Sequence, residues 1–175
     1  MSGPLRILVT GAAGAGSTTL AAALAGHLGC TCLDSDDYFW VKPEPPFQDR
    51  RSPEERLALL VADLERAPRC VLAGGIDGWG GPVEDAFDRI VFLYLDAAVR
   101  LERLRARELR RFGAADPEFL AWAAQYDEGA MDGRSLARQR AWLARRRCPV
   151  IEIEGDLSVA QRMAAVLENL PRSQA

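Results

Sequence analysis

The sequence predicts an α/β fold in which a parallel β-sheet is covered by helices on both faces. Five apolar runs of strand length alternate with segments of helical spacing, which is typical of a parallel sheet with crossover helices. A glycine-rich turn also joins the first apolar run to the first helical segment. The predicted strands are residues 6–10, 31–34, 70–74, 90–95 and 149–153.

Length and composition favour one domain. A chain of 175 residues, 49% of them hydrophobic, can bury a core of its own, so we expect residues 1–175 to form a single domain. No apolar run reaches the roughly 20 residues needed to cross a bilayer, and the start of the chain lacks the features of a signal peptide. A cytoplasmic protein without a membrane partner is therefore expected.

Charge and cysteine usage exclude further classes. The net charge of −3 provides no global attraction to nucleic acid, so no nucleic-acid partner is expected. The four cysteines form no CxxC pair, and His27 is the single histidine, which argues against a zinc site, a disulfide framework and a Ser/His or Cys/His catalytic pair. The oligomeric state stays open, and a monomer is compatible with the sequence.

The turn after the first strand has the shape of a phosphate-binding P-loop. In the pattern G-x-x-x-x-G-K-[ST], backbone N–H groups surround the phosphates, the lysine contacts the β and γ oxygens, and the hydroxyl binds Mg²⁺. Gly11, Gly16 and Thr18 match this pattern, whereas Ser17 stands in the position of the lysine. The predicted phosphate-binding residues are Gly11, Ala12, Ala13, Gly14, Ala15, Gly16, Ser17, Thr18 and Thr19.

This loop retains an anion site without its lysine, because the site consists of backbone N–H groups and the N-terminus of a helix, predicted here at 20–28. One alternative is a glycine-rich turn that serves only close packing. Another is a dinucleotide-binding turn, but Gly11, Gly14 and Gly16 do not have the spacing G-x-G-x-x-G. The strand before the loop and the helix after it favour phosphate binding.

Three carboxylates, Asp34, Asp36 and Asp37, follow the second strand. Parallel strands end at one edge of the sheet, where ligands of such sheets bind, so these residues are expected near the P-loop. They could hold Mg²⁺ through water, accept a proton or bind hydroxyl groups of an acceptor. A local turn or helix cap is the alternative, but neighbouring carboxylates repel and a turn needs only one. The prolines between residues 43 and 46 predict a long loop over 36–51.

The third strand runs into a second glycine-rich turn, which contains Gly74 and Gly75. Such a turn either bends sharply or lets a substrate touch the backbone. Trp79 lies among these glycines and is expected either to face a bound molecule or to cover a small satellite core.

Three helix starts are well marked. Ser52 with Glu55 and Ser158 with Gln161 have the spacing of capping boxes, and Asp116 precedes a proline at a first helical position.

Arginine accounts for 21 of the 22 basic residues. A helix that begins at Asp96 is expected to carry arginines on one arc and apolar residues on another, and Arg134, Arg138 and Arg145 share a stripe on a later helix. The arc of the first helix consists of Arg100, Arg103, Arg107, Arg110 and Arg111. Charged faces are usually plain solvated surface. Here the P-loop lacks its lysine, and a phosphoryl group in transfer needs cationic partners, so we expect these arginines to supply the missing positive charge. Lys42 is a further candidate for this role.

The P-loop, Asp34-Ser-Asp36, Ala73-Gly74-Gly75, and Leu95-Asp96 followed by Arg103 to Arg107 resemble, in order, the nucleoside monophosphate kinase and shikimate kinase group of P-loop kinases. The resemblance extends over about residues 5 to 170 and implies a five-stranded parallel sheet in the order 2-3-1-4-5, with a helical lid at about 108–133. The chain also resembles a bacterial subset, described as adenylate-kinase-like, with Gly-Ser/Thr-Thr in place of Gly-Lys-Thr.

The resemblance implies ATP on the P-loop, Mg²⁺ near Thr18 and Asp36, and an ATP-dependent phosphotransferase acting on a nucleoside, nucleotide or small alcohol. A nucleotide-binding module without chemistry, which orders its lid for a partner, is the main alternative, and a pocket for a nucleoside without ATP is another. The predicted catalytic residues are Asp34, Asp36, Arg103 and Arg107. The predicted acceptor-binding residues are Asp37, Gly74, Gly75, Trp79, Arg134 and Arg138.

Overall fold

The computed structural model describes residues 3–41, 49–129 and 134–170. Five parallel strands form one sheet in the order β2-β3-β1-β4-β5, which confirms the predicted fold class and strand order. Each strand lies within one residue of its predicted bounds. The strands are β1 (Leu5–Gly11), β2 (Thr31–Asp34), β3 (Arg69–Ala73), β4 (Arg89–Tyr94) and β5 (Val150–Glu154).

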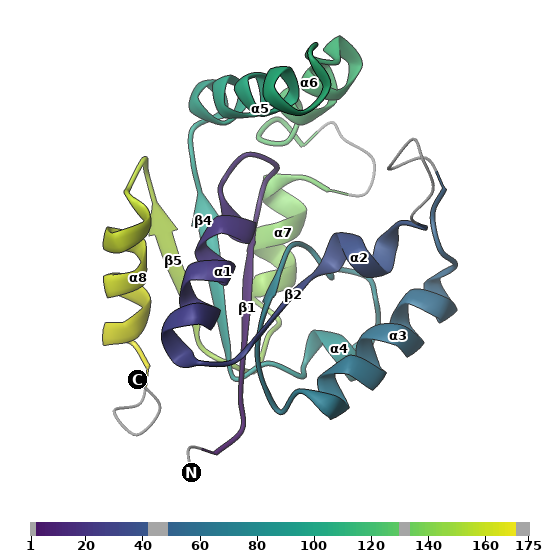
Figure 1. The fold of residues 1–175 in the computed structure, drawn as a ribbon, viewed down its shortest axis with the longest axis vertical. Helices are drawn as coiled ribbons and strands as arrows, with labels where there is room; N and C mark the ends of the chain where they lie inside the picture. Colours follow the sequence, from purple (N-terminus) through teal and green to yellow (C-terminus); the bar gives the residue numbers. More distant parts are fainter. Residues whose placement is uncertain (1–2, 42–48, 130–133, 171–175) are drawn as a thin grey trace.

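Helices cover both faces of the sheet (Figure 1). One face packs against α1 (Ser17–Leu28) and α8 (Val159–Glu168), and the other packs against α3 (Pro53–Arg66), α4 (Gly81–Glu84) and α7 (Leu136–Leu143). Side chains of the central strand β1 alternate between the two cores: Ile7 and Val9 enter the first and Leu8 enters the second. This alternation explains why β1 is apolar along most of its length.

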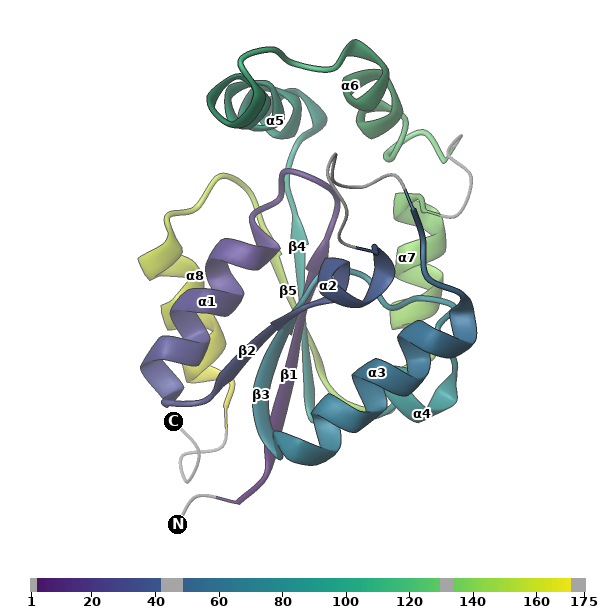
Figure 2. The same ribbon diagram turned by 45° about the vertical axis from the view of Figure 1, so that its right-hand side comes forward.

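Three loops meet at the carboxyl edge of the sheet. The register pairs Val9 and Asp34 with Ala73, so β1, β2 and β3 end side by side. Beyond this edge, α5 (Ala97–Phe112) and α6 (Pro117–Ala124) form a helical pair (Figures 1 and 2). A ligand at this edge would therefore lie between the sheet and the helical pair.

The predicted helix starts are confirmed. Ser52 and Glu55 form both hydrogen bonds of a capping box at α3, and Ser158 and Gln161 do so at α8. Asp116 caps α6 through the N–H of Glu118.

The predicted loop over 36–51 is wrong at its start, where a short helix, α2 (Ser35–Phe39), begins directly after β2. The Asp34 side chain caps this helix by accepting from the N–H of Asp36 at 3.0 Å. Tyr38 is buried, and its hydroxyl donates to Asp63 of α3 at 2.8 Å. This hydrogen bond holds α2 against α3. Lys42 and the proline-rich stretch 43–46 lie outside the described residues.

Across the part of the chain that the structure describes, no helix is long and apolar enough to cross a membrane.

Candidate active site

The P-loop leads into the N-terminus of α1. Gly16 is the N-cap residue and has φ 95°, a conformation that glycine adopts without strain. No side chain caps this helix, and its first turn contains no acidic residue. The N–H groups of the first turn, together with the positive end of the helix dipole, are therefore available to an anion.

Thr18 and Asp34 form a pair of oxygen ligands beside this helix end. Thr18 Oγ1 donates to Asp34 Oδ2 at 3.1 Å. The family resemblance implied Mg²⁺ near Thr18 and Asp36; in the structure Thr18 contacts Asp34, and Asp36 lies in the first turn of α2. The described residues contain no group of three His, Cys, Asp or Glu that could hold a metal ion. One hydroxyl and one carboxylate fit Mg²⁺ that is completed by water and nucleotide phosphates.

Asp36 has an unusual electrostatic environment for a residue at the surface. Neighbouring protein atoms shield its carboxyl from water, and the charge of Asp34 adds to this, so its pKa lies above the ordinary value. Arg134, a hydrogen bond from Trp40 and Arg107 act in the opposite direction. A carboxylate with a raised pKa is suited to accept a proton from an attacking hydroxyl.

The Gly74-Gly75 turn makes room for two neighbouring side chains. A Cβ on Gly74 would lie 1.9 Å from the hydroxyl oxygen of Ser35, and a Cβ on Gly75 would lie 2.7 Å from the Arg134 guanidinium. Arg134 Nη2 also donates to the Gly11 carbonyl at 3.0 Å. The turn therefore lets Arg134 lie between the ends of β1 and β3.

Two predicted arginines of α5 lie near these loops. Arg103 forms an ion pair with Asp156, and its Nη1 lies 3.8 Å from where a Cβ on Gly16 would be. Arg107 pairs with Glu108 at 3.4 Å and is one of the charges that lower the pKa of Asp36. The structure thus places Arg103 beside the P-loop and Arg107 toward Asp36.

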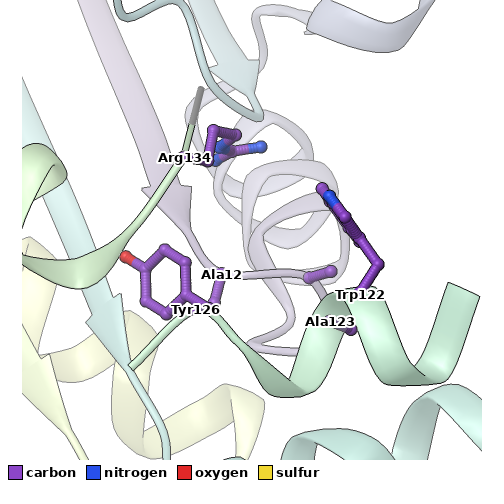
Figure 3. A pocket seen from close by; sticks show the side chains of 6 residues that line it. Ala12, Trp122, Ala123, Tyr126 and Arg134 are labelled. Carbon is purple, nitrogen blue, oxygen red and sulfur yellow. The ribbon is translucent and has the colours of Figure 1, made fainter. Parts of the chain in front are cut away.

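A small cavity lies beside the first residues of the P-loop. Trp122 and Ala123 of α6, together with Tyr126 and Arg134, surround this cavity against Ala12 and Ala13 (Figure 3). Its water-accessible volume is about 10 Å³, enough for one water molecule. A group larger than a water molecule can enter this cavity only if a lining side chain moves.

Trp79 does not face the site. Its side chain is 7% exposed and belongs to the core under α3 and α4, which corrects the expectation that it contacts a bound molecule. Its ring stacks with Phe39 at 6.3 Å between centroids, and the Arg56 guanidinium lies 4.8 Å from its centroid. The glycines around Trp79 leave it little local packing, but residues distant in sequence supply that packing.

The predicted arginine faces also need correction. Arg100 is fully buried, because its position on α5 adjoins that of the core residue Leu104. Arg134 precedes α7 and Arg145 follows it, so only Arg138 of the predicted stripe lies on that helix, where it is exposed.

The remaining predicted residues lie at the surface of the same edge. Thr19 is exposed in the first turn of α1, and Asp37 is exposed in α2, with its carbonyl accepting from Arg51 at 2.8 Å.

Sequence reasoning missed a buried polar group behind the P-loop. Gln139 of α7 donates to Thr10 Oγ1 at 2.8 Å and accepts from the Tyr126 hydroxyl. Burial raises the pKa of Tyr126 to about 12, so this hydroxyl keeps its proton and donates. These bonds connect β1, α7 and the segment after α6 behind the P-loop, and no spacing rule reveals them.

Arg162 of α8 was missed as well. Its side chain is 4% exposed, and Nη1 donates to the Ala15 carbonyl at 2.7 Å. A signal was present in the sequence, because Arg162 precedes Val166 and Leu170 at intervals of four and so occupies a position on the apolar face of α8.

The sheet order, the glycine loop at the end of β1 and the helical pair above it define a P-loop fold of the kinase type. The chain belongs to the family described as AAA domain, whose model matches residues 7–115. It is also 40% identical over 174 residues to a Bacillus subtilis (strain 168) protein named "Uncharacterized protein YqaC", covering 94% of this chain and 96% of that protein.

Solved structures with the same fold include proteins named as small-molecule kinases. A gluconokinase from Sinorhizobium meliloti 1021 has a TM-score of 0.59 at 20% identity and covers 99% of this chain and 95% of its own. A shikimate kinase from Acinetobacter baumannii, in complex with shikimate, has a TM-score of 0.56 at 20% identity and covers 96% of both chains. At these identities the likeness establishes the fold alone.

Proposed function

We propose that this protein is an ATP-dependent, Mg²⁺-requiring phosphotransferase acting on a small-molecule acceptor. The observation that carries the proposal is the juxtaposition, at one edge of the sheet, of an uncapped helix N-terminus with Thr18 and Asp34 on one side and Asp36 with Arg134 on the other. The first group suits a nucleotide, and the second suits an acceptor. The finer assignment to the adenylate-kinase-like subset, with Ser17 in place of lysine, is part of this proposal.

On the donor side, the backbone N–H groups of residues 11–19 would bind the phosphates of ATP, and Thr18 and Asp34 would hold Mg²⁺. When bound, ATP supplies the phosphoryl group and Mg²⁺ offsets the charge of its phosphates. Arg103 and Arg107 would add the positive charge that is absent at Ser17. Lys42 stays a further candidate for this role.

On the acceptor side, Asp36 would take the proton of the acceptor hydroxyl as its oxygen bonds to the γ-phosphorus and the bond from that phosphorus to the bridging oxygen of the leaving ADP breaks. The raised pKa of Asp36 supports this role. Arg134 would contact the anionic part of the acceptor or the transferred group. Gly74 and Gly75 leave the backbone of β3 open to close approach, and Asp37 and Arg138 lie on the exposed rim.

A second function is a nucleotide-binding module that performs no chemistry and uses nucleotide to order its lid for a partner. One observation favours it: Ser17 stands where the lysine belongs. Positioning and electrostatics provide most of the catalysis of phosphoryl transfer, so an uncompensated loss of the lysine would be severe.

Binding and turnover assays separate these functions. Thermal shift with ATP or GTP, with and without Mg²⁺, measures nucleotide binding, and ADP release with a panel of nucleosides, nucleotides and small alcohols measures turnover. Mg²⁺-dependent stabilisation with acceptor-stimulated ADP release supports the phosphotransferase. Stabilisation without turnover supports the module, and no stabilisation contradicts both.

Two variants sharpen these assays. Asp34→Asn keeps the helix cap and removes the charge, so it should abolish the Mg²⁺ dependence of ATP binding. Asp88→Asn is the matched control, because Asp88 accepts from the N–H of Arg6 at the opposite end of β1. Ser17→Lys should raise turnover in a degenerate enzyme, whereas a site adapted to serine should lose activity or stay unchanged.

A further inference from the structure

Three arginines contact backbone carbonyl groups of the P-loop. Arg134 Nη2 donates to the carbonyl of Gly11 at 3.0 Å, Arg162 Nη1 donates to that of Ala15 at 2.7 Å, and Arg100 Nη1 lies 3.5 Å from that of Ala13. The three side chains come from different parts of the chain and reach every second carbonyl of the loop. The loop that lacks a lysine therefore has cations on its carbonyl side.

Arg162 makes the shortest of these contacts. Besides Ala15, its Nη2 reaches the Gly155 carbonyl at 3.3 Å, so the guanidinium bridges the P-loop and the end of β5. A Cβ on Gly16 would lie 3.0 Å from Nη1, so only glycine leaves this space free. The side chain is 4% exposed, and an arginine does not give up its proton in a protein.

The position of this bond determines which way a peptide N–H points. A trans peptide is planar, with its C=O and N–H on opposite sides. Because the Ala15 carbonyl points to Arg162, the N–H of Gly16 points to the other side of the loop. A donor bound to a carbonyl also polarises the peptide, which makes its N–H a stronger donor to an anion.

We propose that Arg162 is a positioning residue of the phosphate-binding loop, which replaces the missing lysine from behind: it holds the Ala15–Gly16 peptide with its N–H toward the phosphates and places a fixed positive charge next to them. Arg162 contacts the loop and not the ligand. The inference rests on the proposed function, because it presumes that the loop binds phosphates.

The test compares Arg162→Met with Arg140→Met. Met keeps the length of the buried stem and removes the charge and the donors, whereas Arg140 is exposed on another surface and pairs with Glu152 at 2.7 Å. Calorimetry measures the Kd of ATP with Mg²⁺ and of inorganic tripolyphosphate, which has no base or sugar. Because R162M removes a hydrogen bond from a charged group, we expect it to raise both Kd values about tenfold or more. R140M should leave both Kd values unchanged.

Hydrogen exchange in the protein without ligand provides a readout that does not depend on phosphate binding. Peptides that cover residues 11–18 should exchange faster in R162M than in the wild type, and at the wild-type rate in R140M. If R162M does not fold, Arg162→Lys keeps the charge with fewer donors, and it should show several-fold weaker binding and faster loop exchange.

The possible failures are distinguishable. Wild-type protein without affinity for ATP or tripolyphosphate overturns the proposed function and with it the inference. Wild-type protein that binds both, with R162M binding equally well, overturns the inference and leaves the proposed function standing. Unchanged loop exchange in R162M, or in R162K where R162M does not fold, also overturns the positioning role.

Discussion

Asp34 and Asp36 stand two residues apart and meet different partners. Asp34 accepts from Thr18 and from the N–H of Asp36, which hold its carboxylate beside α1. Asp36 is partly shielded from water and lies near the charge of Asp34, so its carboxyl binds a proton more tightly than an ordinary aspartic acid. Two carboxylates whose environments differ in this way are suited to different tasks, here metal binding and proton transfer.

Asp36→Asn should lower turnover and raise stability at neutral pH. A general base contributes about a hundredfold or more to a rate, so kcat should fall by at least that factor. The pKa of Asp36 is raised in the folded protein, so the folded state binds this proton more tightly than the unfolded chain. Ionised Asp36 therefore reduces stability above the raised pKa, and that cost fades as the pH falls to the ordinary value and below.

Thermal unfolding of D36N and wild type across this pH range measures the effect. The Tm of D36N should exceed that of the wild type at neutral pH, and the difference should shrink under acid conditions. A D36N variant with a lower Tm at neutral pH contradicts the sign, and one with full turnover removes Asp36 from the mechanism.

The helix α6 lies beside the P-loop. Its residues Trp122 and Ala123 lie against Ala12 and Ala13 and leave space for about one water molecule. Trp122 stacks on Phe119 at 5.9 Å between centroids and is still 40% exposed, so its surroundings report on the position of the helix.

Nucleotide binding should therefore change the fluorescence of Trp122. Adding ATP with Mg²⁺ to the wild type is expected to alter tryptophan emission, because Trp122 lies beside the loop that would bind the phosphates. Trp40 hydrogen-bonds Asp36, so the comparison is made in a Trp40→Phe background. There, Trp122→Phe should lose most of this change, while Trp79 and Trp142, both buried in the core, remain. An undiminished change after this substitution would contradict the placement of the bound phosphates beside Trp122.

Across the whole molecule, one buried cation connects the helical pair to the body. Arg100 Nε donates to Leu95 at 2.9 Å, and Nη2 forms an ion pair with Asp127 at 3.1 Å. Nη1 lies 3.4 Å from the Ala123 carbonyl and 3.5 Å from that of Ala13. The residue after β4, the helix α6 and the P-loop therefore all contact the guanidinium of Arg100, whose side chain is 0% exposed.

Arg100→Met should lower the free energy of unfolding by about 3 kcal/mol or more, because breaking a buried pair leaves Asp127 and several carbonyls without their donor. Urea unfolding monitored by circular dichroism measures this loss. Arg140→Met removes exposed ion pairs to Glu152 and Glu154 and should cost less than about 1 kcal/mol. Equal losses in the two variants would contradict the linking role of Arg100.

Whether a feature could be predicted from the sequence depends on how far apart in the chain its interacting residues are. The strands were predicted within one residue, because period and apolar content are local properties, and both capping boxes formed because their partners stand three residues apart. The helix α2 was missed, since Asp34 was interpreted as part of a carboxylate cluster and its cap extends over two residues only. The roles of the predicted site residues stay predictions.

The sequence by itself determined the α/β alternation, the helix starts and a glycine-rich loop of P-loop spacing with Ser17 in the position of the lysine. Only the tertiary structure decided which arginines contact that loop. The local sequence around an arginine does not show whether its side chain will be buried against a distant segment or exposed to water. Arg134 reaches Gly11 across 123 residues and Arg162 reaches Ala15 across 147, whereas Arg138 stays at the surface. Local patterns specify elements because their energies come from near neighbours in the chain, whereas the place of each cation depends on burial between elements that lie far apart in the sequence.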